Sequence, residues 1–138
     1  MEKLGLVFQD FELLDYLSVE DNILLPARLH GTLNTALRNA ARALVERLEI
    51  ARHWKHLTGE LSQGERQRVA VARALVHSPS VVLADEPTSS LDNNRKTVVM
   101  DLLTAYAKEK KAALVLVTHD AELFTRLDRT VDGEVWAR

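Results

Sequence analysis

Cysteine is absent from the 138 residues, and aromatic residues (5%), glycine (five) and proline (three) are scarce. Without thiols the chain forms neither disulfides nor thiolate metal sites, which fits a cytosolic protein. Positive charge is not in excess either, because 18 Lys and Arg face 20 Asp and Glu, a formal net charge of −2. No surplus of positive charge exists to neutralise a phosphodiester backbone, so we expect no sequence-independent binding to nucleic acid.

Long apolar runs are absent as well. No stretch approaches the ~18 residues that are needed to span a bilayer. The apolar stretch near the N-terminus is too short for a signal peptide and is interrupted by Gln9 and Asp10. We therefore expect any link to a membrane to pass through a partner protein. What is present, 46% hydrophobic and 28% charged residues, is typical of one soluble globular domain.

The hydrophobic pattern predicts an α/β fold. Short apolar runs bounded by polar residues indicate strands at residues 4–8, 81–84 and 114–117, and a last strand is expected at about 131–136. Between these strands the pattern favours helices. The alternation of helices with wholly apolar strands predicts a parallel sheet that is covered by helices on both faces.

Helix boundaries follow from local signals. Apolar positions spaced by three and four predict an amphipathic helix over about 33–50. Ser62 and Glu65 form an S-x-x-E capping box at the start of a second long helix, which ends before Pro79. Further helices are expected from Ser18 toward Pro26, from Asp92 to about Lys110, and from about Ala121.

Two adjacent carboxylates, Asp85 and Glu86, follow the strand predicted at 81–84. The carboxyl edge of an open α/β sheet is where such folds bind ligands. Since side chains alternate along an extended chain, the two acids are expected to point in different directions, so that one could hold a hydrated Mg²⁺ and the other face an attacking water. Taken alone, the pair is equally compatible with solvated acids at a strand end.

The segment Leu61-Ser-Gln-Gly-Glu65 places a hydroxyl and a glycine at a predicted helix N-terminus. Free backbone N–H groups and the helix dipole make such an end an anion site, although in isolation an ordinary capped helix is the simpler explanation. Polar residues also follow the two other strands, His119 after 114–117 and Gln9 after 4–8. Alone, a histidine there is usually structural or exposed, and a glutamine carries little information.

Together the four segments resemble, in order and spacing, the nucleotide-binding domain of ABC-type transporters. Leu61–Glu65 and the helix after it resemble the ABC signature, and Val81–Glu86 resembles the Walker B strand with its catalytic glutamate. Ser89-Ser-Leu-Asp92 resembles the D-loop, Thr118-His-Asp120 the switch histidine, and Gln9 the Q-loop glutamine. The residues around Gln9 and the segment Ala84-Asp-Glu-Pro-Thr88 are most similar to those of the lipoprotein-release and macrolide- or peptide-export class.

The resemblance implies a partial P-loop NTPase (RecA-like) core, with a mostly parallel sheet flanked by helices, plus the helical subdomain of ABC ATPases. It treats residues 1–138 as a single partial ATP-binding domain. The helical subdomain would occupy about 10–60, and 1–9 and 61–138 would belong to the catalytic core. ATP and Mg²⁺ are the implied cofactors, and the implied role is to energise export of a lipoprotein, peptide or drug-like substrate.

By the same resemblance, Asp85 and Gln9 would contact the metal, and Gln9 also the attacking water. Glu86 would act as general base or position that water, and His119 would contact the γ-phosphate. Phosphoryl transfer needs mainly positioning and charge neutralisation, and these groups are of the right kinds.

Other matched residues would act across a dimer. Ser62, Gln63, Gly64 and Glu65 would lie at ATP held by a second ATPase subunit, and Asp92 would communicate between the subunits. The implied partners are that second subunit and a membrane permease, and no nucleic acid. Through the permease the protein would be cytoplasmic and peripheral on the inner face of the cell membrane.

The sequence departs from the resembled family in one large respect. A P-loop needs G-x-x-x-x-G-K-[ST], and none of the five glycines is followed by lysine. The family has this motif upstream of its glutamine loop, so the resemblance implies a chain truncated at its N-terminus and lacking Walker A. We expect weak or absent ATP binding, an inactive isolated chain, and one unpaired, apolar side of the sheet. Smaller departures are Gln63 and Glu65, where the family usually has Gly and Gln.

Two alternatives stay open. The chain could be a non-enzymatic or decayed fragment that keeps the permease-docking and dimer surfaces. It could also be a non-transport ABC ATPase, although the ~50 residues between Gln9 and the signature are too few for the coiled coil of repair-type members. His53 and His56 have no evident third ligand, so a solvated surface is expected there and not a metal site.

Overall fold

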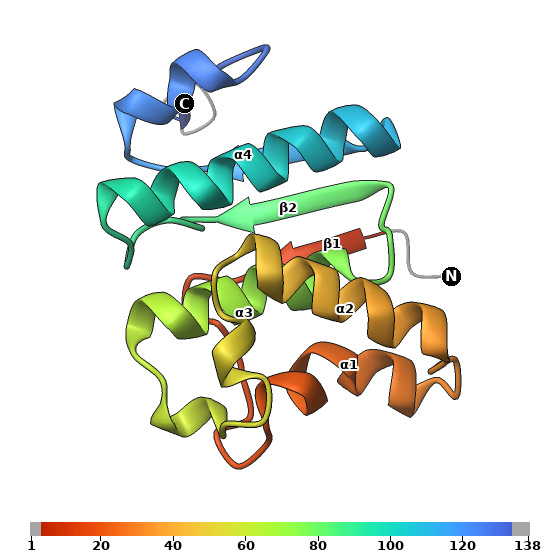
Figure 1. The fold of residues 1–138 in the computed structure, drawn as a ribbon. Helices are drawn as coiled ribbons and strands as arrows, with labels where there is room; N and C mark the ends of the chain where they lie inside the picture. The colour runs from red at the N-terminus through yellow and green to blue at the C-terminus, as the bar shows by residue number, and fades with distance from the viewer. Residues whose placement is uncertain (1–3, 134–138) are drawn as a thin grey trace.

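Three parallel strands form the sheet and bring their carboxyl ends to one edge. The computed structural model describes residues 4–133, and the strands β1 (Leu4–Val7), β2 (Val81–Asp85) and β3 (Ala113–Val117) lie in the order β1-β2-β3. Val7 pairs with Ala84, and Asp85 pairs with Val117. The loops that follow the strands therefore start side by side, at the arrowhead end of β2 in Figure 1.

Helical segments precede, separate and follow β2 and β3. In chain order they are α1 (Val19–Leu29), α2 (Thr35–Arg47), the 3₁₀ helices η1 (Ala51–His53) and η2 (Thr58–Glu60), α3 (Gln63–Leu75), α4 (Asn93–Lys110) and the 3₁₀ helix η3 (Ala121–Arg126). All four α-helices begin at a side-chain cap, namely Ser18, Asn34, Ser62 and Asp92. Three of these caps were predicted from the sequence, and Asn34 was not.

Some predicted boundaries differ from those of the structure. The helix after Ser18 does not end at Pro26 but continues to Leu29, because buried Ala27 extends its apolar face beyond the proline. The segment after Asp120 is a 3₁₀ helix. The expected last strand is not formed by Val131–Gly133, and the rest of that prediction falls outside the described residues.

Helices cover one face of the sheet, which corrects the expectation of two covered faces. Only alternate residues of β2 are buried, Val82 and Ala84, while Leu83 is 38% exposed. On the same open face β3 presents Val115 (49% exposed) and Val117 (52%). On the covered face α3 packs against β1 and α4 against β3, and α1 and α2 pack on α3 (Figure 1). Within residues 4–133 one side of the sheet is thus apolar and uncovered, which agrees with the expectation of one unpaired, apolar side.

A single hydrophobic cluster joins the helices to the covered face. The amphipathic helix α2 contributes Ala41 and Val45 to this cluster. The helix α3 is largely buried and contributes most of its apolar residues between Val69 and Leu75. The largest fully buried side chains come from α1, from the turn after α2, and from α4, namely Ile23, Leu24, Leu48, Ile50, Met100, Leu102 and Leu103. Burial on this scale fixes α3 and the sheet relative to each other, and both carry the candidate site.

Candidate functional site

The first group of predicted site residues meets at the carboxyl edge of the sheet. Gln9 follows β1, Asp85 ends β2 with Glu86 next to it, and His119 comes two residues after β3. The strand register brings these loops together from segments about 30 and 75 residues apart, as parallel pairing requires. The sequence-predicted cluster of Gln9, Asp85, Glu86 and His119 therefore shares one edge.

Glu86 is held by hydrogen bonds on its main chain and on its side chain. Its N–H donates to the carbonyl of Val117 (2.8 Å), and its carboxylate accepts from the Thr118 hydroxyl (3.2 Å) and the main-chain N–H of His119 (2.9 Å). Its backbone is left-handed, with φ of 48°, which costs an ordinary residue about 1–2 kcal/mol. Glu86 and Asp85 do lie in different surroundings, as expected. The cause is the left-handed turn at Glu86, and not the alternation of side chains along a strand.

Asp85 and Gln9 offer oxygen ligands to solvent. Both side chains are exposed, and among residues 4–133 the Asp85 carboxylate has no hydrogen-bond or ion-pair partner. An unpaired carboxylate and an amide oxygen at the same sheet edge are a donor set that suits Mg²⁺, a cation that keeps several of its waters. The chemistry of these residues therefore fits the metal that the resemblance implies.

The loop after Gln9 is fixed by Arg73 of α3. Phe11 and Glu12 are consecutive non-glycine residues with left-handed backbones, with φ of 63° and 50°. The Arg73 guanidinium donates to both of their carbonyls, at 2.6 and 2.7 Å. Burial lowers the pKa of Arg73, with the nearby Glu12 opposing that effect. The guanidinium of Arg73 thus stabilises a strained turn, and it fixes the path of the chain after Gln9.

The second group of predicted residues surrounds the N-terminus of α3. Ser62 caps the helix, its hydroxyl accepting from the Glu65 N–H (3.2 Å) while its own N–H donates to the Glu65 carboxylate (3.1 Å). An open cleft of about 550 Å³ lies in front of this end. Its lining contains Ser62, Gln63, Gly64, Glu65 and Asp92, together with Glu49, Arg52, Arg68, Ser90, Leu91 and Arg95.

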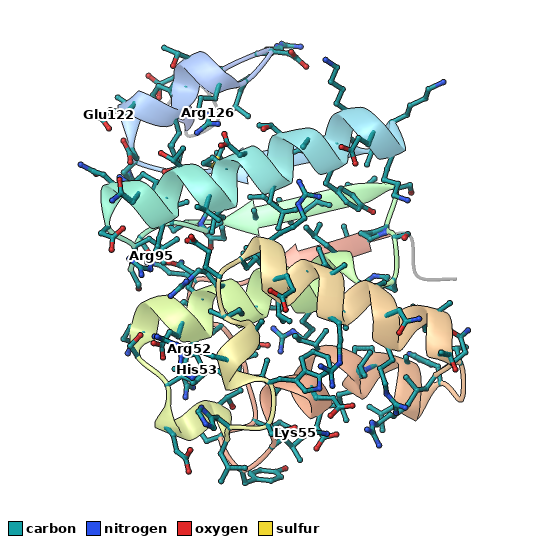
Figure 2. All side chains as sticks on the ribbon, viewed as in Figure 1. Arg52, His53, Lys55, Arg95, Glu122 and Arg126 are labelled. Carbon is teal, nitrogen blue, oxygen red and sulfur yellow. The ribbon has the colours of Figure 1, made fainter. Side chains whose placement is uncertain are left out.

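Positive side chains face the cleft from two sides. Figure 2 shows Arg52 and Arg95 on the same side of the molecule, one from η1 and the other from the start of α4. Arg95 is partly engaged by Asp92, with the two side chains 2.9 Å apart. The Arg95 N–H bonded to Asp92 holds the pKa of that carboxyl below its usual range, and the Arg95 guanidinium adds to the effect. The lining balances three arginines against three carboxylates, so the N-terminus of α3 supplies the remaining attraction for an anion.

Glu65 is a carboxylate in a place that favours its charge. Partial burial raises the pKa of Glu65. The hydrogen bond from the Ser62 N–H and the charges of His53, Arg68 and Arg52 together lower it by more, so the pKa lies below its ordinary value of 4.5. His53 lies 3.3 Å from the Glu65 carboxylate, and its Nδ1 lies 2.9 Å from Nδ1 of His56. The solvated surface expected at this histidine pair is therefore wrong for His53, which keeps only 14% of its side chain exposed.

The two groups are separate within the chain. None of Gln9, Asp85, Glu86 and His119 lines the cleft at α3. His119 has a fully exposed imidazole whose Nε2 lies 3.8 Å from the nearer Glu86 oxygen. In the described part of the chain, no cluster of three or more His, Cys, Asp or Glu residues is arranged to hold a metal ion. No helix there is both long and apolar enough to cross a membrane.

Sequence reasoning missed three residues that position this site. Thr118 bonds to the Glu86 carboxylate, Arg73 holds the loop after Gln9, and Gln67 bonds to the Glu86 carbonyl. Thr118 had a signal, since it stands beside His119 at a strand end. For Arg73 the only hint was its place among the Val, Ala and Leu residues of the second half of α3, where a polar side chain needs a partner. Gln67 lies in the polar first half of that helix, and nothing local marked it as buried.

Comparisons with known proteins agree with this architecture. The family model described as "ABC transporter" matches residues 1–89. YbbA of Escherichia coli (strain K12), an uncharacterized ABC transporter ATP-binding protein, is 44% identical over 125 residues, which are 91% of this chain and 55% of YbbA. The lipoprotein-releasing system ATP-binding protein LolD of Shewanella sp. (strain MR-4) is 41% identical over 128 residues, 93% of this chain and 55% of LolD.

A solved structure has the same fold. The dimeric post-hydrolysis state of the ATP-binding cassette MJ0796, bound to ADP and Pi, matches with a TM-score of 0.81 at 36% identity. The match covers 88% of this chain and 54% of that one, so this chain spans about half the length of the relatives that it matches. The family model covers well over half of the 138 residues. This chain belongs to the ABC transporter family and carries part of its ATP-binding domain.

Proposed function

We propose that this chain supplies part of an ATP-hydrolysing subunit that energises transport of a lipoprotein, peptide or drug-like substrate through a separate membrane permease. One observation carries the proposal. Gln9, Asp85, Glu86 and His119 share the carboxyl edge of the sheet, while a distinct anion-favouring cleft lies at the N-terminus of α3. One chain thus has one set of groups for its own nucleotide and another for a partner's. The resemblance to LolD supports the choice of transported class.

The proposed roles follow from the surroundings of each side chain. Glu86 keeps its carboxylate oriented by Thr118 and by the His119 N–H, so it is placed to orient or deprotonate an attacking water. The exposed imidazole of His119 is free to reach a γ-phosphate. Asp85 and Gln9 would hold Mg²⁺, which supplies neutralisation of phosphate charge in such reactions.

The proposed partner contacts use the other surfaces. Ser62, Gln63, Gly64 and Glu65 would meet the phosphate end of ATP held by a second ATPase subunit, with Asp92 at the dimer contact. Residues 10–60, which include α1 and α2, would form the helical subdomain that meets the permease. The subunit would then lie on the cytoplasmic face of the membrane, held there by that permease.

A chimera tests the catalytic proposal. The half of YbbA that precedes its match to this chain is fused to residue 1, and release of phosphate from Mg·ATP is measured. We expect hydrolysis that falls by about 10²-fold or more in Glu86→Gln and His119→Ala, the scale of general acid–base and electrostatic effects. A folded chimera whose hydrolysis is unaffected by either change would contradict the assigned roles.

The isolated chain tests the part played by the missing loop. Fluorescent ATP is titrated with Mg²⁺ into the 138-residue chain, and we expect no saturation in the micromolar range, because no P-loop holds the phosphates. Micromolar affinity that Asp85→Ala abolishes would overturn this expectation. If the chimera is also inactive while the chain binds a purified permease, the non-enzymatic docking module becomes the better account.

A further inference from the structure

Gln67 is a polar side chain sealed from solvent, and it connects the two groups of site residues. It lies in α3 two positions after Glu65 and is 0% exposed. Its Nε2 donates to the carbonyl of Glu86 (2.8 Å) and lies 3.4 Å from the Ser89 hydroxyl, while its Oε1 accepts from the Ser90 N–H (2.9 Å). Every hydrogen bond of this side chain therefore ends on the segment that follows β2.

A second contact joins the same two segments. A Cβ added to Gly64 would lie 3.1 Å from the carbonyl oxygen of Ser90 and 3.2 Å from Cδ2 of Leu91. The first turn of α3 thus rests directly on this segment, with little room for a side chain. Both main-chain polar groups of Ser90 face α3, its carbonyl toward Gly64 and its N–H toward Gln67.

Glu86 needs such support because its backbone is left-handed. A non-glycine residue keeps this conformation only where its surroundings over-determine it. The N–H and carboxylate of Glu86 are held from the side of β3, by Val117, Thr118 and His119. The carbonyl of Glu86 accepts a hydrogen bond from Gln67 of α3. It also accepts a longer one (3.3 Å) from the N–H of Ser89, three residues further along the chain.

We propose that Gln67 is a positioning residue that couples the N-terminal turn of α3 to Glu86 within one subunit. The proposal rests on the proposed function, in which that turn meets a partner's nucleotide and Glu86 acts on the chain's own. A shift of α3 on engaging the partner's phosphate moves the Gln67 amide, which carries the Glu86 carbonyl and Ser90 with it. An apolar side chain of similar size would fill the space but would transmit no direction, since it makes no hydrogen bonds.

The test uses amide hydrogen exchange in the 138-residue chain, resolved by NMR. The two reporters are the Ser90 N–H, which Gln67 accepts, and the His119 N–H, which the Glu86 carboxylate accepts. In Gln67→Met both amides should exchange about fivefold faster or more, the factor expected for losing one hydrogen bond. Glu109→Met, which introduces the same side chain at an exposed position of α4, should leave both rates unaltered.

A double-mutant cycle separates coupling from simple loss of stability. Ser62→Ala removes the cap of α3 without adding an atom, and we expect it to change the His119 exchange rate in the wild-type background. In the Gln67→Met background the same substitution should change that rate by less than half as much. A Ser62→Ala effect on His119 that is equal in both backgrounds, or that matches the exchange of all core amides, would overturn the proposal. ATP hydrolysis by the chimera is measured separately from the exchange rates. A failed coupling test with an active chimera would therefore overturn only the role of Gln67, and an inactive chimera would overturn only the proposed function.

Discussion

The main-chain N–H of His119 donates to the Glu86 carboxylate at 2.9 Å, while the imidazole of the same residue is fully exposed. The main chain of His119 thus serves the structure, while its side chain is open to solvent and, under the proposed function, would contact the γ-phosphate. Loss of the imidazole should therefore affect catalysis but not folding.

We expect His119→Ala to change the free energy of unfolding by less than about 0.5 kcal/mol, as is usual for an exposed side chain. Thr118→Val, of similar size, removes a hydroxyl that donates to Glu86 and accepts from the Asp120 N–H, and should cost about 1–2 kcal/mol. Urea unfolding of the isolated chain measures both. Equal losses in the two variants would show that the imidazole has a structural role after all.

The left-handed backbone of Glu86 predicts an unusual order of stability. Glycine is normally the weaker choice by about 0.5–1 kcal/mol, but it adopts positive φ without strain. Glu86→Ala and Glu86→Gly remove the same carboxylate, so their difference isolates the backbone. Glu86→Gly should be the more stable variant by about 1 kcal/mol in urea unfolding. The same pair of substitutions at Glu109, a helical position of α4, should give the opposite order.

Glu65 predicts a specific pH dependence of stability. Its pKa is lower in the folded chain than its ordinary 4.5, so its charge stabilises the fold above that value. This contribution is fully present above the unfolded pKa and is lost as the pH falls through the lower, folded one. Glu65→Gln keeps an acceptor for the Ser62 N–H but has no charge. The stability advantage of the wild type over this variant should shrink as the pH falls below about 4.5. An advantage that grows as the pH falls below about 4.5 would contradict the sign.

Local signals in the sequence explain why helix starts were predictable. Ser18, Ser62 and Asp92 cap helices through bonds to residues three positions away, so the relevant chemistry lies within one turn. The edge that collects Gln9, Asp85, Glu86 and His119 was also predictable, because parallel strands place their carboxyl ends together. The family resemblance then assigned roles that neither capping nor periodicity could have assigned.

Other features depend on contacts between distant parts of the chain. Arg73 bonds to a carbonyl 62 residues earlier, and Gln67 to one 19 residues later. No local pattern specifies such partners, because a buried polar residue requires a partner without stating which one. The left-handed Glu86 is similar, since its conformation is imposed by neighbours on β3 and α3. The hydrophobic pattern alone predicted two covered faces, because an apolar strand does not reveal what covers it, and only the comparison with the resembled family predicted one open, apolar side.

The uncovered face of the sheet predicts association of the isolated chain. Val115 and Val117 lie on it with about half of each side chain exposed, and contiguous apolar surface of this kind favours contact with other molecules. The double substitution Val115→Thr and Val117→Thr keeps shape and strand preference while adding hydroxyls. It should lower binding of a hydrophobic fluorescent probe and reduce concentration-dependent assembly in sedimentation velocity. Val131→Thr is the matched control, because Val131 is 50% exposed but lies outside the sheet. If the control lowers probe binding and assembly as much as the double variant does, the open face is not their source.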